Sequence, residues 1–155
     1  MQPYAASQIN SGDQLLFDKI RICIGVLPEI DLGKDGRFQK IPISCHLLAR
    51  AVADVFDVKA VDGKFLDAHD HSWTETRSGN IIDVYPIASL GGPILWDSNA
   101  PLLTKLMYER MSEKESEEYY SWSLDPSFFP NVQLISNELE KISNRLGIRR
   151  TVAAS

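Results

Sequence analysis

Apolar residues recur at helical spacing in the first half of the chain. Residues 13–27 place them every three or four positions, with Ser11 or Asp13 as the N-cap and Pro28 as the stop. Residues 44–57 repeat the pattern and predict a second helix. The stretch between the two is rich in Gly, Asp and Lys, so we expect it to be an exposed loop.

The second half of the chain adds two predicted helices. One is expected to begin after Asn99–Pro101 and to continue through the charged segment that ends at residue 120. The other covers about residues 131–148, where Gly147 supplies the stop. Residues 87–101 contain two adjacent glycines and two prolines and are expected to be mostly loop.

Strand patterns lie between these helices. Residues 57–66 are β-branched and aromatic enough for a strand with a turn or bulge at Asp62–Gly63. The next segment, DHSWTETRSGNIIDVYP, contains two alternating runs around a short polar stretch and predicts a hairpin.

The hairpin predicts which side chains meet across its two strands. If residues 76–78 form a three-residue loop, Trp73 lies opposite Ile81 and His71 lies opposite Asp83. Directly opposed side chains on paired strands are close enough for an imidazole to reach a carboxylate.

These elements predict an α+β fold in one domain covering residues 1–155, with residues 1–10 as a flexible tail. The two N-terminal helices are expected to pack on a small antiparallel sheet of at least three strands. A C-terminal helical pair is expected to cover the rest.

Charge and hydropathy narrow the classes of partner. The chain has 16 Lys and Arg against 21 Asp and Glu, a net charge of −5, and no basic stripe that would attract nucleic acid. Its N-terminus resembles no signal peptide, and no window approaches about 18 consecutive apolar residues. We therefore expect a soluble cytoplasmic protein with neither nucleic-acid nor membrane partners.

The two cysteines have different surroundings in the sequence. Cys23 lies in an apolar run, where a thiol behaves as a small hydrophobic side chain. Cys45 follows the N-cap candidate Ser44, so its sulfur is expected at the positive end of a helix dipole. A disulfide framework is not expected from only two cysteines.

A helix-start cysteine becomes a nucleophile when a base and an orienting acid accompany it. His71 and Asp83 are the candidates for base and acid. The backbone N–H of Cys45 is a candidate oxyanion donor, and Gln39 is a second, side-chain candidate.

The order of these motifs resembles the transglutaminase-like branch of the papain-like cysteine enzymes. SCHLLARAVADVF is similar to the nucleophile helix of that family, HSW to its His-x-Trp strand, and NIIDVYP to its acidic strand. The resemblance covers residues 39–86. It implies a papain-like core with Cys45 as nucleophile, His71 as base and Asp83 as orienting acid, and Gln39 is placed like papain's oxyanion glutamine.

On this resemblance we expect a cysteine hydrolase or acyltransferase that needs no cofactor and forms a thioester with a protein, a peptide or a small amide. Protease, amidase, deamidase and transglutaminase-like activities all fit. Arylamine acetyltransferases share the Cys-His-Asp order but are much longer proteins. Trp73 and Trp96 are candidate substrate-binding residues, although packing roles also fit them.

Two alternatives remain open at this stage. The first is a non-catalytic interaction module on the same scaffold, which binds a partner through the loop Gly91–Pro101 or the aromatic, acidic segment near Tyr119. The second is a metal site, for which the chain offers carboxylate, imidazole and thiol ligands. These ligands are Asp67, His69, Asp70 and His71, with Cys45 and His46 as outer candidates.

Overall fold

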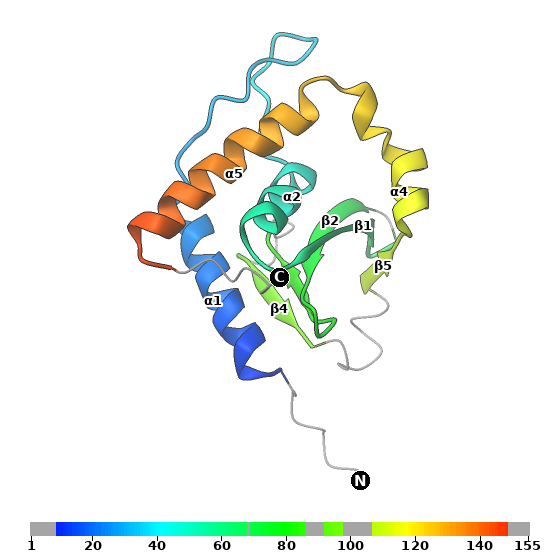
Figure 1. The fold of residues 1–155 in the computed structure, drawn as a ribbon. Coiled ribbons are helices and arrows are strands. Elements are labelled where there is room, and N and C mark those ends of the chain that lie inside the picture. The colour runs from blue at the N-terminus through cyan, green and yellow to red at the C-terminus, as the bar shows by residue number, and fades with distance from the viewer. Residues whose placement is uncertain (1–8, 68, 86–91, 98–106, 149–155) are drawn as a thin grey trace.

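The computed structural model describes residues 9–67, 69–85, 92–97 and 107–148. Within them, helices surround one curled, five-stranded antiparallel sheet (Figure 1). The helices are α1 (Ser11–Gly25), α2 (Cys45–Val55), α4 (Glu113–Tyr120) and α5 (Phe128–Arg145), with a 3₁₀ turn, η1 (Trp122–Leu124). The strands are β1 (Lys59–Phe65), β2 (His69–Glu75), β3 (Ile81–Asp83), β4 (Ile94–Trp96) and β5 (Tyr108–Arg110), in the sheet order β4-β3-β2-β1-β5. The mixed α and β character predicted from the sequence is confirmed.

Helix α2 is the centre of the main hydrophobic core. It packs on β1 and β2 with one side and against α5 with the other, while α1 meets α5 near the C-terminal end of α5 (Figure 1). The apolar residues that predicted α1, α2 and α5 are the ones that form this core, among them Ile20, Val52 and Leu139, all fully buried. No described helix is long and apolar enough to cross a membrane.

The first helix begins at a different cap from the two predicted. Asn10, not Ser11 or Asp13, is the N-cap, and its side chain accepts a hydrogen bond from the Asp13 N–H at 2.8 Å. The carboxylate of Asp13 instead accepts hydrogen bonds from Thr76 and Asn80, each at 2.7 Å. Asp13 therefore ties α1 to the end of the β2–β3 hairpin.

A second, smaller core fills the inner face of the curled sheet. Val61, Phe65, Trp73 and Tyr108 form it, and they point away from α2. Because side chains alternate along a strand, Ser72 and Thr74 lie on the α2-facing side of β2, while His71 and Trp73 lie on the inner side. This alternation places His71 and Asp83 on one face of the sheet and Ser72 and Asp62 on the other.

The predicted turn at Asp62–Gly63 is wrong, because β1 continues through both residues. Gly63 pairs with His71 on one side and with Arg110 of β5 on the other. A Cβ at Gly63 would overlap the Glu109 carbonyl oxygen and the ring of Trp73. Gly63 allows the backbones of β1 and β5 to approach closely. A sequence pattern cannot distinguish a glycine with this role from a glycine in a turn.

Gly63→Ala is expected to lower the free energy of unfolding by about 1–3 kcal/mol, because the backbone of β5 has to move away from the added methyl group. Urea denaturation measures the change. Gly36→Ala is the matched control, since a Cβ at Gly36 has no atom within 4 Å. That variant should change stability by less than about 0.5 kcal/mol, and an equal loss at both positions would contradict the packing explanation.

The hairpin is present, but its register differs from the prediction by two residues. Thr74 pairs with Ile82 and Glu75 with Ile81, and the Thr76 N–H bonds the Asn80 carbonyl at 2.9 Å. The loop is therefore residues 77–79, closed by Gly79 at a φ of 86°. A two-residue shift keeps every side chain on its predicted face, so His71 and Asp83 become diagonal neighbours.

Two short strands replace segments that were predicted otherwise. Ile94–Trp96 was expected to be loop but forms β4 on β3, and Tyr108–Arg110 was expected to be helical but forms β5 on β1. Both strands have three residues, too few to show a period of two, and sheet pairing outweighs the helix propensity of the second. Residues 1–8, 86–91 and 98–106, on which parts of the predicted tail, loop and helix fall, lie outside the described residues.

Candidate active site

Cys45 is the first residue of α2, as predicted. The hydroxyl of Ser44 caps the helix by accepting a hydrogen bond from the Leu47 N–H at 3.3 Å. The N–H groups of Cys45 and His46 are the first two of the helix and have no acceptor within it. The half-buried Cys45 sulfur therefore sits beside backbone donors at the positive end of α2.

The predicted contact between His71 and Asp83 is present. The His71 Nε2 atom lies 2.8 Å from Asp83 Oδ2, and the side chains are only 2% and 1% exposed. The same Oδ2 accepts a hydrogen bond from the Tyr108 hydroxyl at 2.8 Å, and Trp96 donates to that hydroxyl at 3.2 Å. The Tyr85 N–H donates to the other oxygen, Oδ1, at 3.3 Å. A buried carboxylate with these donors is held in one orientation, and it fixes the imidazole in turn.

The ionisation of Cys45 and His71 is coupled. Burial alone raises the pKa of the Cys45 thiol, but hydrogen bonds from His46 and His71 and from the Ser72 backbone outweigh it and lower the pKa to about 6. Burial alone lowers the pKa of His71, but its bonds to Asp83 and Cys45 raise that pKa to about 9. Between these two values the sulfur is a thiolate and the imidazole is protonated.

A cavity of about 740 Å³ opens beside this pair. Cys45 and His71 form part of its wall, and His69 and Asp70 add polar groups. The remaining wall is apolar and comes from the end of α1 and the segments that follow it, from α2, and from the residues around β3 and β4. These residues are Ile24, Leu27, Pro28, Ile43, Leu48, Val84, Tyr85 and Pro93.

Three other predicted site residues do not line this cavity. Gln39 is exposed in a tight turn, where its N–H and carbonyl bond Asp35. Trp73 is 1% exposed in the inner core of the sheet. Trp96 donates a hydrogen bond to the Tyr108 hydroxyl. Gln39 therefore does not line the cavity that contains Cys45, and both tryptophans pack in or against the smaller core.

The metal alternative gains no support from the described residues, among which no group of three or more His, Cys, Asp and Glu side chains is arranged to hold an ion. His71 is occupied by Asp83, and Asp70 pairs with Lys64 at 2.5 Å. In the segment near Tyr119, which the interaction alternative names, Tyr119 is 55% exposed, whereas Tyr120 and Trp122 pack against His46. Only part of the loop Gly91–Pro101 is described.

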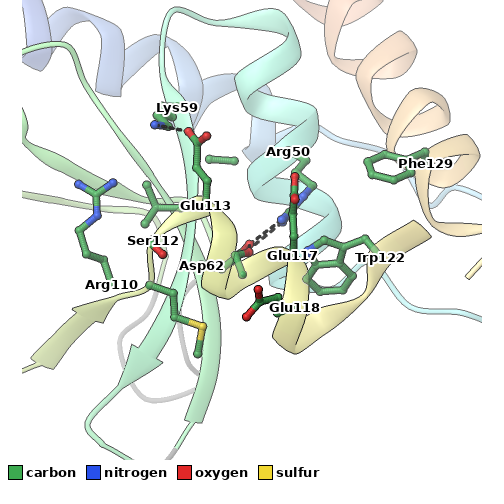
Figure 2. Close-up of a pocket in the computed structure, with 14 residues that line it drawn as sticks. Arg50, Lys59, Asp62, Arg110, Ser112, Glu113, Glu117, Glu118, Trp122 and Phe129 are labelled. Atoms are coloured by element: carbon green, nitrogen blue, oxygen red, sulfur yellow. Dashed lines mark hydrogen bonds and ion pairs between the residues drawn. The ribbon is translucent and has the colours of Figure 1, made fainter. Parts of the chain in front are cut away.

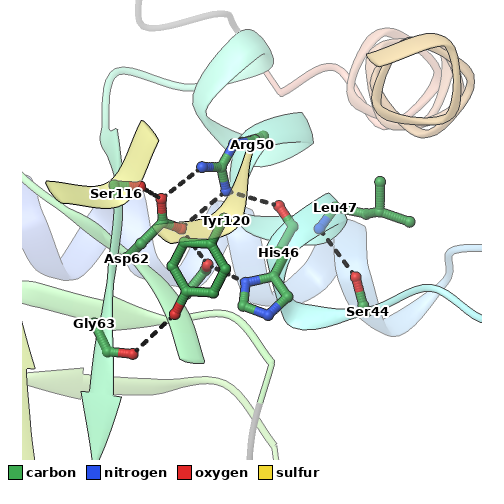
Figure 3. Close-up of polar contacts among 9 residues, drawn as sticks. Ser44, His46, Leu47, Arg50, Asp62, Gly63, Ser116 and Tyr120 are labelled. Carbon is green, nitrogen blue, oxygen red and sulfur yellow. Dashed lines mark hydrogen bonds and ion pairs between the residues drawn. The ribbon is translucent and has the colours of Figure 1, made fainter. Parts of the chain in front are cut away.

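Sequence reasoning missed a second polar group beside Cys45. His46, an outer candidate in the metal alternative, bonds Ser72, and Ser72 bonds the buried Asp62. Figure 3 shows His46 and Arg50 on α2 and Asp62 on β1. Arg50 pairs with Asp62 at the wall of a separate cavity of about 700 Å³ (Figure 2). The signal available was the i, i+4 pair His46 and Arg50 on the helix that carries Cys45.

Comparison of the chain with protein-family models, curated proteins and solved structures finds no match.

Proposed function

We propose that this protein is a cysteine-dependent amide hydrolase or acyltransferase with a papain-like, transglutaminase-like core. One observation carries the proposal: a buried imidazole–carboxylate pair lies beside a thiol at the start of a helix. The proposal assigns Cys45 as nucleophile, His71 as acid and base, and Asp83 as orienting group.

The chemistry follows from these positions. The Cys45 thiolate attacks a carbonyl carbon, and the developing oxyanion accepts hydrogen bonds from the first-turn N–H groups of α2. Protonated His71 gives its proton to the leaving amine as the carbon–nitrogen bond breaks, which leaves a thioester. Neutral His71 then takes a proton from water or an acceptor amine as it attacks the thioester, and the thiolate leaves.

The walls of the cavity favour an apolar acyl group. Side chains such as Leu27, Leu48 and Val84 surround the space next to Cys45, and apolar walls stabilise bound apolar surface by roughly 25 cal/mol per Å² removed from water. The substrate class we propose is therefore a protein, a peptide or a small amide or thioester whose acyl side chain is large and apolar.

The first test is the pH dependence of iodoacetamide alkylation, read by mass spectrometry at each cysteine. Because the pKa of Cys45 is about 6, its alkylation rate should rise through pH 6 and reach a plateau near neutrality. His71→Ala should move this rise to higher pH. Cys23, which is fully buried and whose pKa is raised by burial, is the internal control and should stay unmodified. A Cys45 that titrates like a free thiol, near pH 8.5, contradicts the proposal.

Turnover should be bell-shaped in pH. The thiolate form of Cys45 is present above a pKa of about 6, and the protonated form of His71 is present below a pKa of about 9. Activity on acyl p-nitroanilides with large apolar acyl groups is therefore expected to be highest between these values.

A further inference from the structure

A hydrogen-bonded chain that the proposed mechanism does not use ends beside Cys45. The Nδ1 atom of His46 lies 2.6 Å from Ser72 Oγ, and Ser72 Oγ lies 2.5 Å from Asp62 Oδ1. The Asp62 side chain is only 4% exposed. A buried carboxylate, a hydroxyl and an imidazole thus lie in line next to the proposed nucleophile.

The chemistry of these groups fixes the direction of each hydrogen bond. Ionised Asp62 only accepts, so the Ser72 hydroxyl hydrogen points to it and the Ser72 oxygen accepts from His46 Nδ1–H. The second ring nitrogen of His46, Nε2, is then the one that the bond to Ser72 does not use. Arg50 holds Asp62 through two bonds, of 3.0 and 2.6 Å, and Ser116 donates to it as well.

Aromatic rings fix the imidazole plane of His46. Its centroid lies 5.1 Å from that of Tyr120 and 4.9 Å from that of Trp122. These two rings stack on each other at 4.7 Å, and the Arg50 guanidinium lies 4.8 Å above Trp122. The packing holds the His46 side chain in one position on the half-exposed start of α2.

The two histidines belong to different faces of the sheet. Adjacent residues on a strand point to opposite faces, so His71 lies with Asp83 on the inner face and Ser72 lies with Asp62 on the face toward α2. The Cys45 thiol contacts both imidazoles and the backbone of Ser72. Each imidazole is oriented by its own carboxylate, one directly and one through a serine.

We propose that His46 is a second catalytic imidazole for Cys45, held by Ser72 and Asp62, and that it stabilises the thiolate independently of His71. This inference rests on the proposed function. Of the groups that lower the pKa of Cys45, His46 contributes the most, followed by His71.

Several ionisable groups surround His46 and set its electrostatic environment. Cys45 and Arg50 lie on its own helix, Asp62 lies on β1 behind Ser72, and Tyr120 of α4 packs on its ring. Arg50 is bound to Asp62 and to the His46 carbonyl, so its charge is partly compensated at this position.

The test measures iodoacetamide alkylation of Cys45 against pH in the wild type, His46→Gln, His71→Ala and the double variant. If both imidazoles stabilise the thiolate, each single variant raises the apparent pKa by about one unit or more, so that alkylation at pH 6 slows roughly fivefold or more. The double variant should approach the free-thiol value near 8.5. An unchanged pH profile in His46→Gln, with a shifted profile in His71→Ala, overturns this inference and leaves the proposed function standing.

Ser72→Ala provides the second measurement. It removes the hydroxyl that orients His46 without leaving Arg50 unpaired, and should shift the Cys45 profile in the same direction as His46→Gln but by less. Thr74→Val is the matched control, because it removes another buried hydroxyl of β2, one that bonds the Ile82 carbonyl. A shift of equal size in the Cys45 pH profile of Thr74→Val overturns the role of the His46–Ser72–Asp62 chain. A wild-type Cys45 that titrates like a free thiol overturns the inference and the proposed function together.

Discussion

Cys45→Ala is expected to lower the rate of acyl transfer or amide cleavage by roughly 10⁴-fold or more, because the proposed reaction passes through a thioester on this sulfur. The fold should be unaffected, since Cys45 is half-buried at the start of a helix that Ser44 continues to cap. The measurement combines turnover of acyl p-nitroanilides with intact mass after exposure to p-nitrophenyl acetate. The wild type should gain one acetyl group at Cys45, and the variant should gain none there.

Cys23→Ala is the matched control for this result. Cys23 is fully buried in α1, and burial raises the pKa of its thiol, so its removal should leave turnover and acetylation unchanged. The creation of a small cavity should cost only about 1 kcal/mol of stability. Full activity in Cys45→Ala, or equal losses in the two variants, contradicts the assignment of Cys45 as nucleophile.

The sequence was sufficient to predict that Cys45, His71 and Asp83 lie together, because each of them lies in a strongly patterned segment. Ser44 precedes a periodic apolar run, which places Cys45 in the first turn of α2. His71 and Asp83 lie on two strands in which apolar and polar residues alternate. Because side chains on a strand alternate with a period of two, both residues stay on one face of the sheet although the predicted register was off by two residues. The predicted contact between His71 and Asp83 is present, at 2.8 Å, in spite of the wrong register, because an imidazole also reaches a diagonal neighbour on the next strand.

The positions of Tyr108, Asp62 and Ser72 in the site could not be predicted, because they depend on pairings between segments far apart in the chain. Tyr108 reaches Asp83 only because residues 108–110 form an edge strand on β1, and local propensity favours a helix there. Asp62 was attributed to a turn because Gly63 follows it, whereas the glycine is needed where β5 and Trp73 approach closely. No local pattern in this sequence reveals that Ser72 stands opposite Asp62, and the link from Asp62 to His46 follows from that pairing.

Asp62→Ala is expected to cause the largest loss of stability, about 3–5 kcal/mol, which corresponds to a decrease in Tm of roughly 10 °C. Asp62 is the shared acceptor for Arg50, Ser72 and Ser116. Its removal leaves the guanidinium of Arg50, whose side chain is 18% exposed, without its carboxylate partner at the wall of the cavity in Figure 2. Urea denaturation at neutral pH measures the loss.

The pH dependence and a control distinguish this cause from general damage to the sheet. Although burial raises the pKa of Asp62, hydrogen bonds from Arg50, Ser116 and Ser72 outweigh it and lower that pKa. A depressed folded-state pKa gives stability that is present at neutral pH and lost as pH falls toward it, so the difference between wild type and variant should shrink in acid. Asp70→Ala removes a carboxylate from the next strand, where the pair with Lys64 is 41% and 31% exposed, and should cost less than about 1 kcal/mol. Similar losses in the two variants, or a difference for Asp62→Ala that does not change with pH, would show that the buried ion pair does not stabilise the junction between α2 and β1.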